Sequence, residues 1–314
     1  MIVANNKIYW LHCMTPTHAG VGRGVGYIDL PIDRDAVTNW PLVRGSAFKG
    51  VWSDYYLNEE SKKANKRLTR DDLREHQIAF GRSSDATDNV SNSGSLIPTD
   101  ARLVCLPVRS FRGTFAWCTS SLALRFLHRT LTLAGMKAEV PKVLDVPPAE
   151  DTAFVAPGTA LREGSKIYLE DLDFEAKDQA EVAAWAAAIA GWTFPDDPAW
   201  QGEFKKRFVV LPDVVFDFLC ETGTEVHTRV RISDETKTVV TGALWTEESL
   251  PAETILAGVV ACDRVFGKDG KDITPAGLLD SFAAKPLSLQ IGGKATVGRG
   301  QVRCVFTKVE GGGK

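Results

Sequence analysis

One carboxylate near the N-terminus lies in a loop among positively charged side chains, and this combination suits chemistry on a phosphodiester. The carboxylate is Asp29, and the cations that flank its loop are Arg23, Arg34 and Lys49. A carboxylate in this setting can bind a divalent metal ion or help to deprotonate a ribose 2′-hydroxyl group. An ordinary solvated aspartate in a turn is the alternative, and the residues alone leave both interpretations open.

His18 is a second candidate, because an imidazole titrates near neutral pH and can serve as a general acid or base. A structural histidine that only forms hydrogen bonds is the alternative. The sequence contains neither a Ser-His-Asp order nor a G-x-S-x-G elbow, so it gives no support to those hydrolase classes.

A glycine-rich segment near the C-terminus, GGKATVGRG at residues 292–300, invites a nucleotide-binding interpretation. It is not a P-loop, because Lys294 follows the first glycines rather than the last and a strand comes next. Exposed backbone N–H groups together with Lys294 and Arg299 can still hold a phosphate, and a plain glycine-rich hairpin is the alternative.

The segment GSAFKG at residues 45–50 combines a helix start with a lysine. Ser46 is expected to cap the helix, which places Lys49 in the first turn. A lysine there opposes the helix dipole unless an anion binds at the helix start. A solvated lysine is the alternative.

A β-hairpin is predicted from residue 225 onward. Residues 225–232 alternate strictly, so that His227, Arg229 and Arg231 share one face, and a turn at residues 234–235 precedes a return strand. A solvated edge that resists aggregation is one explanation of the charged face.

Length, composition and charge limit the classes of protein to consider. The chain has 314 residues, 44% of them hydrophobic, and a net charge of −3. The charge counts against a free-standing nucleic-acid binder but allows local basic stripes. No apolar run approaches the roughly 20 residues of a membrane helix, and residues 1–7 lack the pattern of a signal peptide. We therefore expect a cytoplasmic protein without membrane contact.

The cysteines show no pattern of a metal site or a disulfide framework. None of the six lies in a C-x-x-C pair, and each stands among apolar or strand-forming residues: Cys13, Cys105, Cys118, Cys220, Cys262 and Cys304. A structural zinc ion needs clustered ligands, and disulfide frameworks belong to small secreted chains. Free, mostly buried thiols are expected.

Helical and strand patterns occur without regular alternation, which favours an α+β fold. Thr69 and Asp72 match a capping box for a short helix that ends near Phe80. Other helix boundaries are expected at Thr119 or Ser120, Gly191 and Asp213. Residues 81–99 are rich in Ser, Asp, Asn and Gly, and such a segment is expected to form a mobile insertion.

Several stretches together are similar to a known family. They are TPTHAGVGRGVGYIDLPIDRD (15–35), WPLVRGSAFKG (40–50), LPVRSFRGTFAWCTS (106–120), TKTVVTGALWTEESLP (236–251) and IGGKATVGRG (291–300). In this order they resemble the backbone subunit of the type III-B CRISPR effector, the Cmr complex, within the RAMP superfamily. GSAFKG occurs across the superfamily, whereas LPVRSF…FAW and GALW…EE…LP are more specific to this subunit.

The resemblance implies a single RAMP domain over residues 1–314 with an RRM-like, ferredoxin-like palm. The palm would comprise residues 1–58, 101–222 and 255–308, with an inserted lid at 59–100 and a hairpin thumb at 223–254. It also implies partners, namely CRISPR RNA, target RNA, further copies of the chain in a helical filament and other Cmr subunits.

The implied reaction is cleavage of target RNA at regular intervals, by attack of a 2′-hydroxyl on the adjacent phosphate. Asp29 stands at the position of the family's catalytic aspartate and would contact a transient Mg²⁺ or Mn²⁺ ion, with no zinc and no nucleotide required. The expected RNA-binding residues are His18, Arg23, Arg34, Lys49, Arg229, Arg231, Lys294 and Arg299. Trp245, Glu247 and Glu248 fall in the thumb without an assigned role.

The chain departs from the family pattern near Asp29. Asp33 stands where glutamine is common, Asp35 where glutamate is common, and Asn39-Trp40 replaces a usual Gly-Phe. The extra charge of Asp33 is expected to affect metal dependence. A non-catalytic RNA-binding scaffold and an unrelated small-molecule enzyme are the alternative functions.

Overall fold

A mixed sheet of thirteen strands forms the framework of the computed structural model, which describes residues 5–22, 27–82, 92–136, 140–147, 149–266 and 272–308. Its strands are β1 (Asn6–Cys13), β2 (Leu42–Val43), β5 (Ile97–Pro98), β6 (Ala101–Arg109), β7 (Phe115–Ser120), β8 (Thr152–Val155), β9 (Arg162–Glu163), β10 (Lys166–Leu169), β11 (Leu172–Asp178), β12 (Phe208–Leu211), β15 (Ile255–Ala261), β16 (Leu287–Gln290) and β17 (Gln301–Lys308). They follow the order β16-β17-β1-β15-β6-β7-β12-β8-β11-β10-β9, while β2 pairs with β6 and β5 pairs with β15.

Helices cover both faces of this sheet. They are α1 (Gly45–Lys63), α2 (Arg74–Phe80), α3 (Ser121–Ala134), α4 (Ala180–Thr193), α5 (Pro198–Arg207), α6 (Asp213–Thr222) and α7 (Pro275–Phe282). From β1, Ile8 and Trp10 join a core with α3 and α4, whereas Tyr9 and Leu11 join a core with α1 and α7. Because both faces are buried, apolar residues run without interruption from Ile8 to Leu11 instead of alternating with polar ones. The predicted α+β class is confirmed.

The first and last described strands are neighbours at the centre of the fold. β1 is antiparallel to both β15 and β17, and Trp10 pairs with Ala257 on one side and Val305 on the other. Strands from all three palm segments therefore share one sheet. The exact division into palm, lid and thumb stays a prediction.

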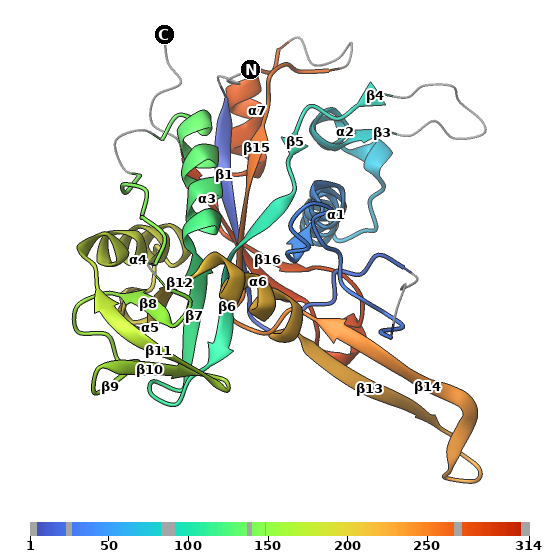
Figure 1. Cartoon of the computed structure of the whole chain (residues 1–314). Coiled ribbons are helices and arrows are strands. Elements are labelled where there is room, and N and C mark those ends of the chain that lie inside the picture. The colour runs from blue at the N-terminus through green and yellow to red at the C-terminus, as the bar shows by residue number, and fades with distance from the viewer. Residues whose placement is uncertain are drawn as a thin grey trace.

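The predicted hairpin is present and extends away from the body (Figure 1). It consists of β13 (Glu225–Ile232) and β14 (Val239–Ser249), which pair so that Val230 faces Leu244 and Arg229 faces Trp245. Six of its large apolar side chains are exposed on β13 and β14: Val226, Val230, Ile232, Val239, Val240 and Leu244. Only the base of the hairpin, from Glu247 to Ser249, is buried.

Three helix boundaries differ from the predictions. The N-cap of α1 is Arg44 rather than Ser46, and α6 begins at Asp213 itself, with Pro212 as its N-cap. Helix α4 continues through Gly191 to Thr193, because its C-terminal turn is buried. The Ser120 cap and the Thr69–Asp72 capping box are confirmed, the latter on a short 3₁₀ turn at residues 70–72 before α2.

Three further expectations concern the insertion, the thiols and the membrane. Residues 83–91 of the expected mobile insertion lie outside the described residues, and its remainder includes β3 (Gly81–Arg82), β4 (Asn92–Ser93) and β5. All six cysteines are free and buried, as predicted. Among the described residues, no helix is long and apolar enough to cross a membrane.

Candidate functional site

Asp29 is exposed, and Thr246 on strand β14 anchors its carboxylate. The backbone N–H and the hydroxyl of Thr246 donate to Oδ2 of Asp29 at 2.8 and 3.0 Å, and the Asp29 N–H donates to the same hydroxyl at 3.0 Å. These bonds favour the charged form and hold the pKa of the Asp29 carboxyl below its ordinary value. Within the described part of the chain, no hydrogen bond reaches Oδ1, which is left for another partner.

The loop that carries Asp29 is joined to the hairpin through its backbone. Leu30 and Glu247 form an isolated parallel bridge. The Leu30 N–H donates to the carbonyl of Thr246 at 3.1 Å, and the Glu248 N–H donates to the carbonyl of Leu30 at 2.9 Å. Asp29 is therefore placed by the hairpin strand as well as by its own loop.

Glu248, at the base of the hairpin, binds the part of the loop that follows Asp29. Its carboxylate is buried and accepts from the Ile32 N–H at 3.0 Å, from Arg34 at 2.5 Å and from the Thr224 hydroxyl at 2.8 Å. Both carboxylate oxygens are therefore occupied within the protein. The geometry gives this residue of the predicted thumb a structural task beside Asp29.

His18 is buried under the same strand. Its Nδ1 donates to the carbonyl oxygen of Glu248 at 2.6 Å, and its own carbonyl accepts from the Gly293 N–H at 3.0 Å. A Cβ at Gly292 would lie 2.0 Å from that carbonyl oxygen, and one at Gly20 would lie 2.6 Å from the His18 ring. These two glycines let the backbone approach His18 closely, and the C-terminal glycine segment thereby packs beside the loop.

The carboxylate of Glu247 pairs with two cationic side chains on the face of the hairpin opposite to Glu248. Lys294 and the indole N–H of Trp245 each donate to Oε1 at 2.7 Å, and Arg229 lies 3.5 Å from Oε2. Burial works against ionisation of Glu247, but the bonds from Lys294 and Trp245 outweigh it and leave the pKa of this carboxyl below its usual value. Lys294 also lies 5.7 Å from the centre of the Trp245 ring.

Two of the predicted RNA-binding arginines have partners inside the protein. Arg34 donates to Glu248 and also to the carbonyl of Cys220 at 2.9 Å. Arg299 is buried and donates to the hydroxyl of Ser249 at 2.7 Å. A phosphate group would reach either guanidinium only in competition with these partners.

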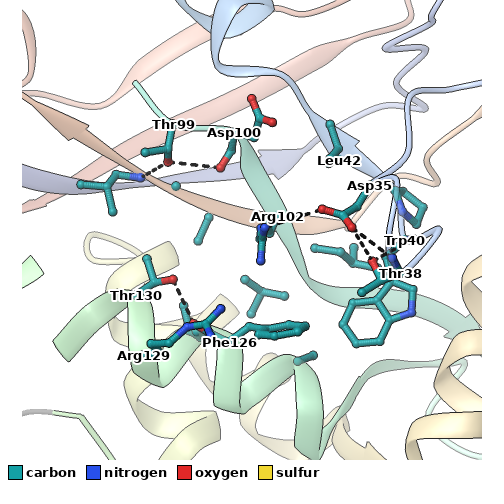
Figure 2. A pocket seen from close by; sticks show the side chains of 18 of the residues that line it. Asp35, Thr38, Trp40, Leu42, Thr99, Asp100, Arg102, Phe126, Arg129 and Thr130 are labelled. Carbon is teal, nitrogen blue, oxygen red and sulfur yellow. Dashed lines mark hydrogen bonds and ion pairs between the residues drawn. The ribbon is translucent and has the colours of Figure 1, made fainter. Parts of the chain in front are cut away.

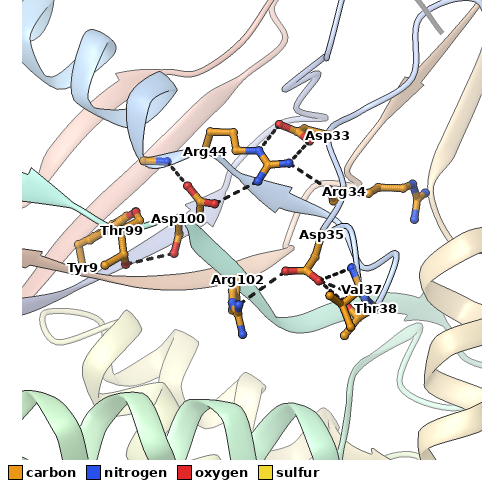
Figure 3. A network of polar contacts seen from close by, with 11 residues as sticks. Tyr9, Asp33, Arg34, Asp35, Val37, Thr38, Arg44, Thr99, Asp100 and Arg102 are labelled. Carbon is orange, nitrogen blue, oxygen red and sulfur yellow. Dashed lines mark hydrogen bonds and ion pairs between the residues drawn. The ribbon is translucent and has the colours of Figure 1, made fainter.

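Arg44 and two aspartates join the loop to the start of α1, as Figure 3 shows. The guanidinium of Arg44 donates two hydrogen bonds to the carboxylate of Asp33, at 2.6 and 2.9 Å, and one to the carboxylate of Asp100 at 3.2 Å. The other oxygen of Asp100 accepts from the Gly45 N–H at 2.8 Å. The helix start thus already holds a carboxylate, so the protein itself supplies the anion that the sequence led us to expect there.

The departures from the family pattern at residues 35–40 have local explanations. The carboxylate of Asp35 caps a turn by accepting from the N–H groups of Val37 and Thr38, both at 3.0 Å, and these bonds lower its pKa. Asn39 adopts a positive φ of 58°, a conformation that asparagine tolerates where glycine is usual. Trp40 donates from its indole nitrogen to Asp217 at 3.0 Å.

The remaining predicted RNA-binding cations differ in burial and in whether a carboxylate pairs with them. Lys49 is half-buried, which lowers the pKa of its ammonium group, and within the described ranges no carboxylate pairs with it. Arg231 is exposed near the hairpin tip, also without a carboxylate partner there, whereas Arg229 lies near Glu247. Arg23 lies outside the described residues.

A pocket of about 380 Å³ lies between α3 and residues 35–42, next to this network (Figure 2). Phe126 lines the pocket and forms cation–π contacts with two arginines. The guanidinium of Arg102 lies 5.6 Å from the centre of its ring, and that of Arg129 lies 5.3 Å from it. Asp35 lines this pocket but Asp29 does not, so the pocket adjoins the loop without forming the candidate site.

The donor set at Asp29 suits a metal ion that is shared with a substrate. The part of the chain that the structure describes holds no group of three acidic, histidine or cysteine side chains able to cage an ion. Mg²⁺ is commonly held by one or two carboxylates together with substrate phosphates and water. One ionised carboxylate with a free oxygen fits that pattern.

Sequence patterns did not reveal Thr246, Arg44 or Asp100, although these residues position the site. Their partners lie far away along the chain: Thr246 and Asp29 are separated by 217 positions, and Arg44 and Asp100 by 56. A threonine within a hairpin strand carries no local signal for this role. The signal available was only that its strand lay in the stretch resembling GALW…EE…LP.

The comparisons with known proteins agree across nearly the whole chain. The RAMP superfamily profile matches residues 10–303. The CRISPR system Cmr endoribonuclease Cmr4 of Pyrococcus furiosus is 32% identical over 307 residues, which cover 96% of each chain. The CMR subunit Cmr4 of Saccharolobus solfataricus is 23% identical over 318 residues, which cover 94% of each.

Solved structures show the same fold. Oligomeric Cmr4 from Pyrococcus furiosus superposes with a TM-score of 0.70 at 25% identity, over 98% of this chain and 99% of that one. A chain of the type III-B Cmr-beta complex bound to cognate target RNA gives 0.69 at 18% identity over 98% of both, a likeness of fold alone. With a superfamily profile that spans residues 10–303 and a relative 32% identical over 96% of its length, the chain belongs to the RAMP superfamily.

Proposed function

We propose that this chain is a repeating backbone subunit of a type III-B CRISPR ribonucleoprotein, which binds CRISPR RNA and cleaves complementary target RNA at regular intervals. Similarity over 96% of the chain to a Cmr endoribonuclease supports this function. The observation that carries the cleavage role is Asp29, an exposed, ionised carboxylate fixed at the base of a projecting hairpin.

Asp29 acts on the ribose–phosphate link in its charged form. Because hydrogen bonds lower its pKa, the carboxylate is a weak base near neutral pH and is better suited to orienting the attacking 2′-hydroxyl than to removing its proton outright. Oδ2 is held by Thr246, which directs Oδ1 toward the substrate. His18 lies buried below and supports the strand rather than reaching the RNA.

A divalent ion, Mg²⁺ or Mn²⁺, would neutralise charge that develops on the phosphate when it is bound. Oδ1 of Asp29 is the protein ligand in this proposal, and the RNA phosphate supplies the others. Asp33 does not compete for the ion, since Arg44 already binds both of its oxygens.

RNA contacts are assigned to cations without strong internal partners. Lys49 and Arg231 meet that description, and Arg229 is only loosely paired with Glu247. Guide pairing supplies sequence specificity, so these side chains would contact phosphate and sugar. Copies of this chain and other Cmr subunits are the protein partners, and the cytoplasm is the proposed location.

The test uses the assembled complex with its guide RNA and a labelled complementary target. Asp29→Ala is expected to bind target normally while the regular fragments disappear. Asp33→Asn is the matched control, because it removes a nearby carboxylate that Arg44 neutralises, and it is expected to cut. Fragments formed by the Asp29 variant at the normal rate would refute the catalytic assignment, and intact target with the unaltered protein would favour a non-catalytic scaffold.

A further inference from the structure

The hydroxyl of Thr246 forms two hydrogen-bond contacts with Asp29. It accepts the Asp29 N–H at 3.0 Å and lies 3.0 Å from Asp29 Oδ2, while the Tyr27 carbonyl is farther away at 3.3 Å. Together with the Thr246 N–H, this closes a ring of hydrogen bonds around the carboxylate. The ring determines which oxygen of Asp29 remains open.

The position on the strand explains why Thr246 can do this. Side chains alternate along β14, so Trp245 and Glu247 point to the opposite face, where Lys294 meets both. Thr246 shares its face with Thr228, its direct partner on β13. Its branched Cβ restricts χ1, which keeps the hydroxyl aimed at the loop.

We infer that Thr246 is a positioning residue for cleavage: its hydroxyl fixes the orientation of Asp29, so the hairpin strand completes the active carboxylate. This rests on the proposed function, in which Asp29 contacts the reacting RNA. The consequence is a specific one. Removing the hydroxyl frees the carboxylate to rotate, whereas the N–H of residue 246 and the backbone bridge at Leu30 remain in place.

The experiment compares four variants in the assembled guide complex under single-turnover conditions with saturating target RNA. Thr246→Val keeps the branched shape and removes only the hydroxyl, and Thr246→Ser keeps the hydroxyl. Thr228→Val makes the same chemical change at the paired position on β13, whose side chain forms no hydrogen bond with Asp29. Asp29→Asn reports whether Asp29 itself is needed.

Thr246→Val is expected to lower the cleavage rate by about 10- to 100-fold, the range for losing one hydrogen bond to a charged group. Target affinity is expected to stay unchanged. Thr246→Ser is expected to restore the rate to within about threefold, and Thr228→Val to leave it unaltered.

Two results would overturn the inference while leaving the proposed function intact. One is a normal rate for Thr246→Val alongside an inactive Asp29→Asn. The other is an equal loss in Thr246→Val and Thr246→Ser, because the hydroxyl would then not be the cause. Cleavage by Asp29→Asn at the normal rate would instead refute the proposed function on which the inference rests.

Discussion

The guanidinium of Arg34 lies 2.5 Å from the carboxylate of Glu248, whose side chain is only 2% exposed. Arg34 belongs to the loop that carries Asp29, and Glu248 belongs to the base of the hairpin, so this ion pair ties the two together. The Ile32 N–H and the Thr224 hydroxyl complete the coordination of the carboxylate. A buried charge with every oxygen occupied fixes geometry more than it adds stability.

Removing this carboxylate should therefore be costly. Glu248→Ala leaves Arg34 without its carboxylate partner and is expected to lower the free energy of unfolding by about 3 kcal/mol, with loss of cleavage. Glu248→Gln is expected to do less damage, because its amide oxygen can still accept from the Ile32 N–H. Chemical denaturation and the target-cleavage assay measure the two effects, and an Ala variant as stable as the unaltered protein would contradict the prediction.

The predicted RNA-binding arginines should separate into two groups. Arg231 is exposed, so Arg231→Ala is expected to weaken target binding and to reduce the salt slope of the binding constant by about 1, with little change in stability. Arg299 is buried against Ser249, so Arg299→Ala is expected to lower stability instead. Binding titrations at several salt concentrations and denaturation curves test this division. Equal salt slopes for Arg231→Ala and the unaltered complex would exclude a phosphate contact.

His76 should make stability depend on pH. It is buried in α2 against Ser53 at 3.0 Å, and burial lowers its pKa from the ordinary value of 6.5. The unfolded chain then binds a proton more readily than the folded one, so this contribution is complete above pH 6.5 and is lost as the pH falls below it. His76→Gln is expected to flatten the fall in unfolding free energy between about pH 7 and about pH 5, an interval that brackets the ordinary pKa of histidine. Identical slopes for the two proteins would disprove the assignment.

The thiols should resist reagents in the folded state. Burial raises the pKa of Cys13 to about 12 and that of Cys262 to about 11, and all six cysteines are buried. Because the thiolate is the reactive form, modification by a disulfide reagent at pH 8 is expected to be slow until denaturant is added. Rapid modification of the native protein would show that at least one thiol is accessible.

Local patterns predicted the elements better than they predicted the connections between them. Strict alternation in residues 225–232 was enough to place a hairpin strand, and the Thr69–Asp72 capping box was readable over four positions. The start of α1 was placed wrongly because its capping carboxylate, Asp100, comes from the link between β5 and β6, 55 positions later. Thr246 was missed for the same reason, since tertiary contacts decide its role.

The predicted cations show the limit of charge patterns. Arg34, Arg231 and Arg299 look alike in the sequence, yet only Arg231 is left exposed. The partners of the other two, Glu248 and Ser249, lie 214 and 50 positions away. The resemblance to the RAMP superfamily did not distinguish these arginines either.

The placement of β1 between β15 and β17 has a consequence for biosynthesis. Strand β1 is translated long before both of its partners, residues 255–261 and 301–308. At about 5–20 residues per second, the nascent chain carries an unpaired apolar strand for roughly 15 to 60 seconds. Open strand edges recruit other chains, so this interval is when newly made protein is most exposed to association, and it ends when translation delivers the closing strand.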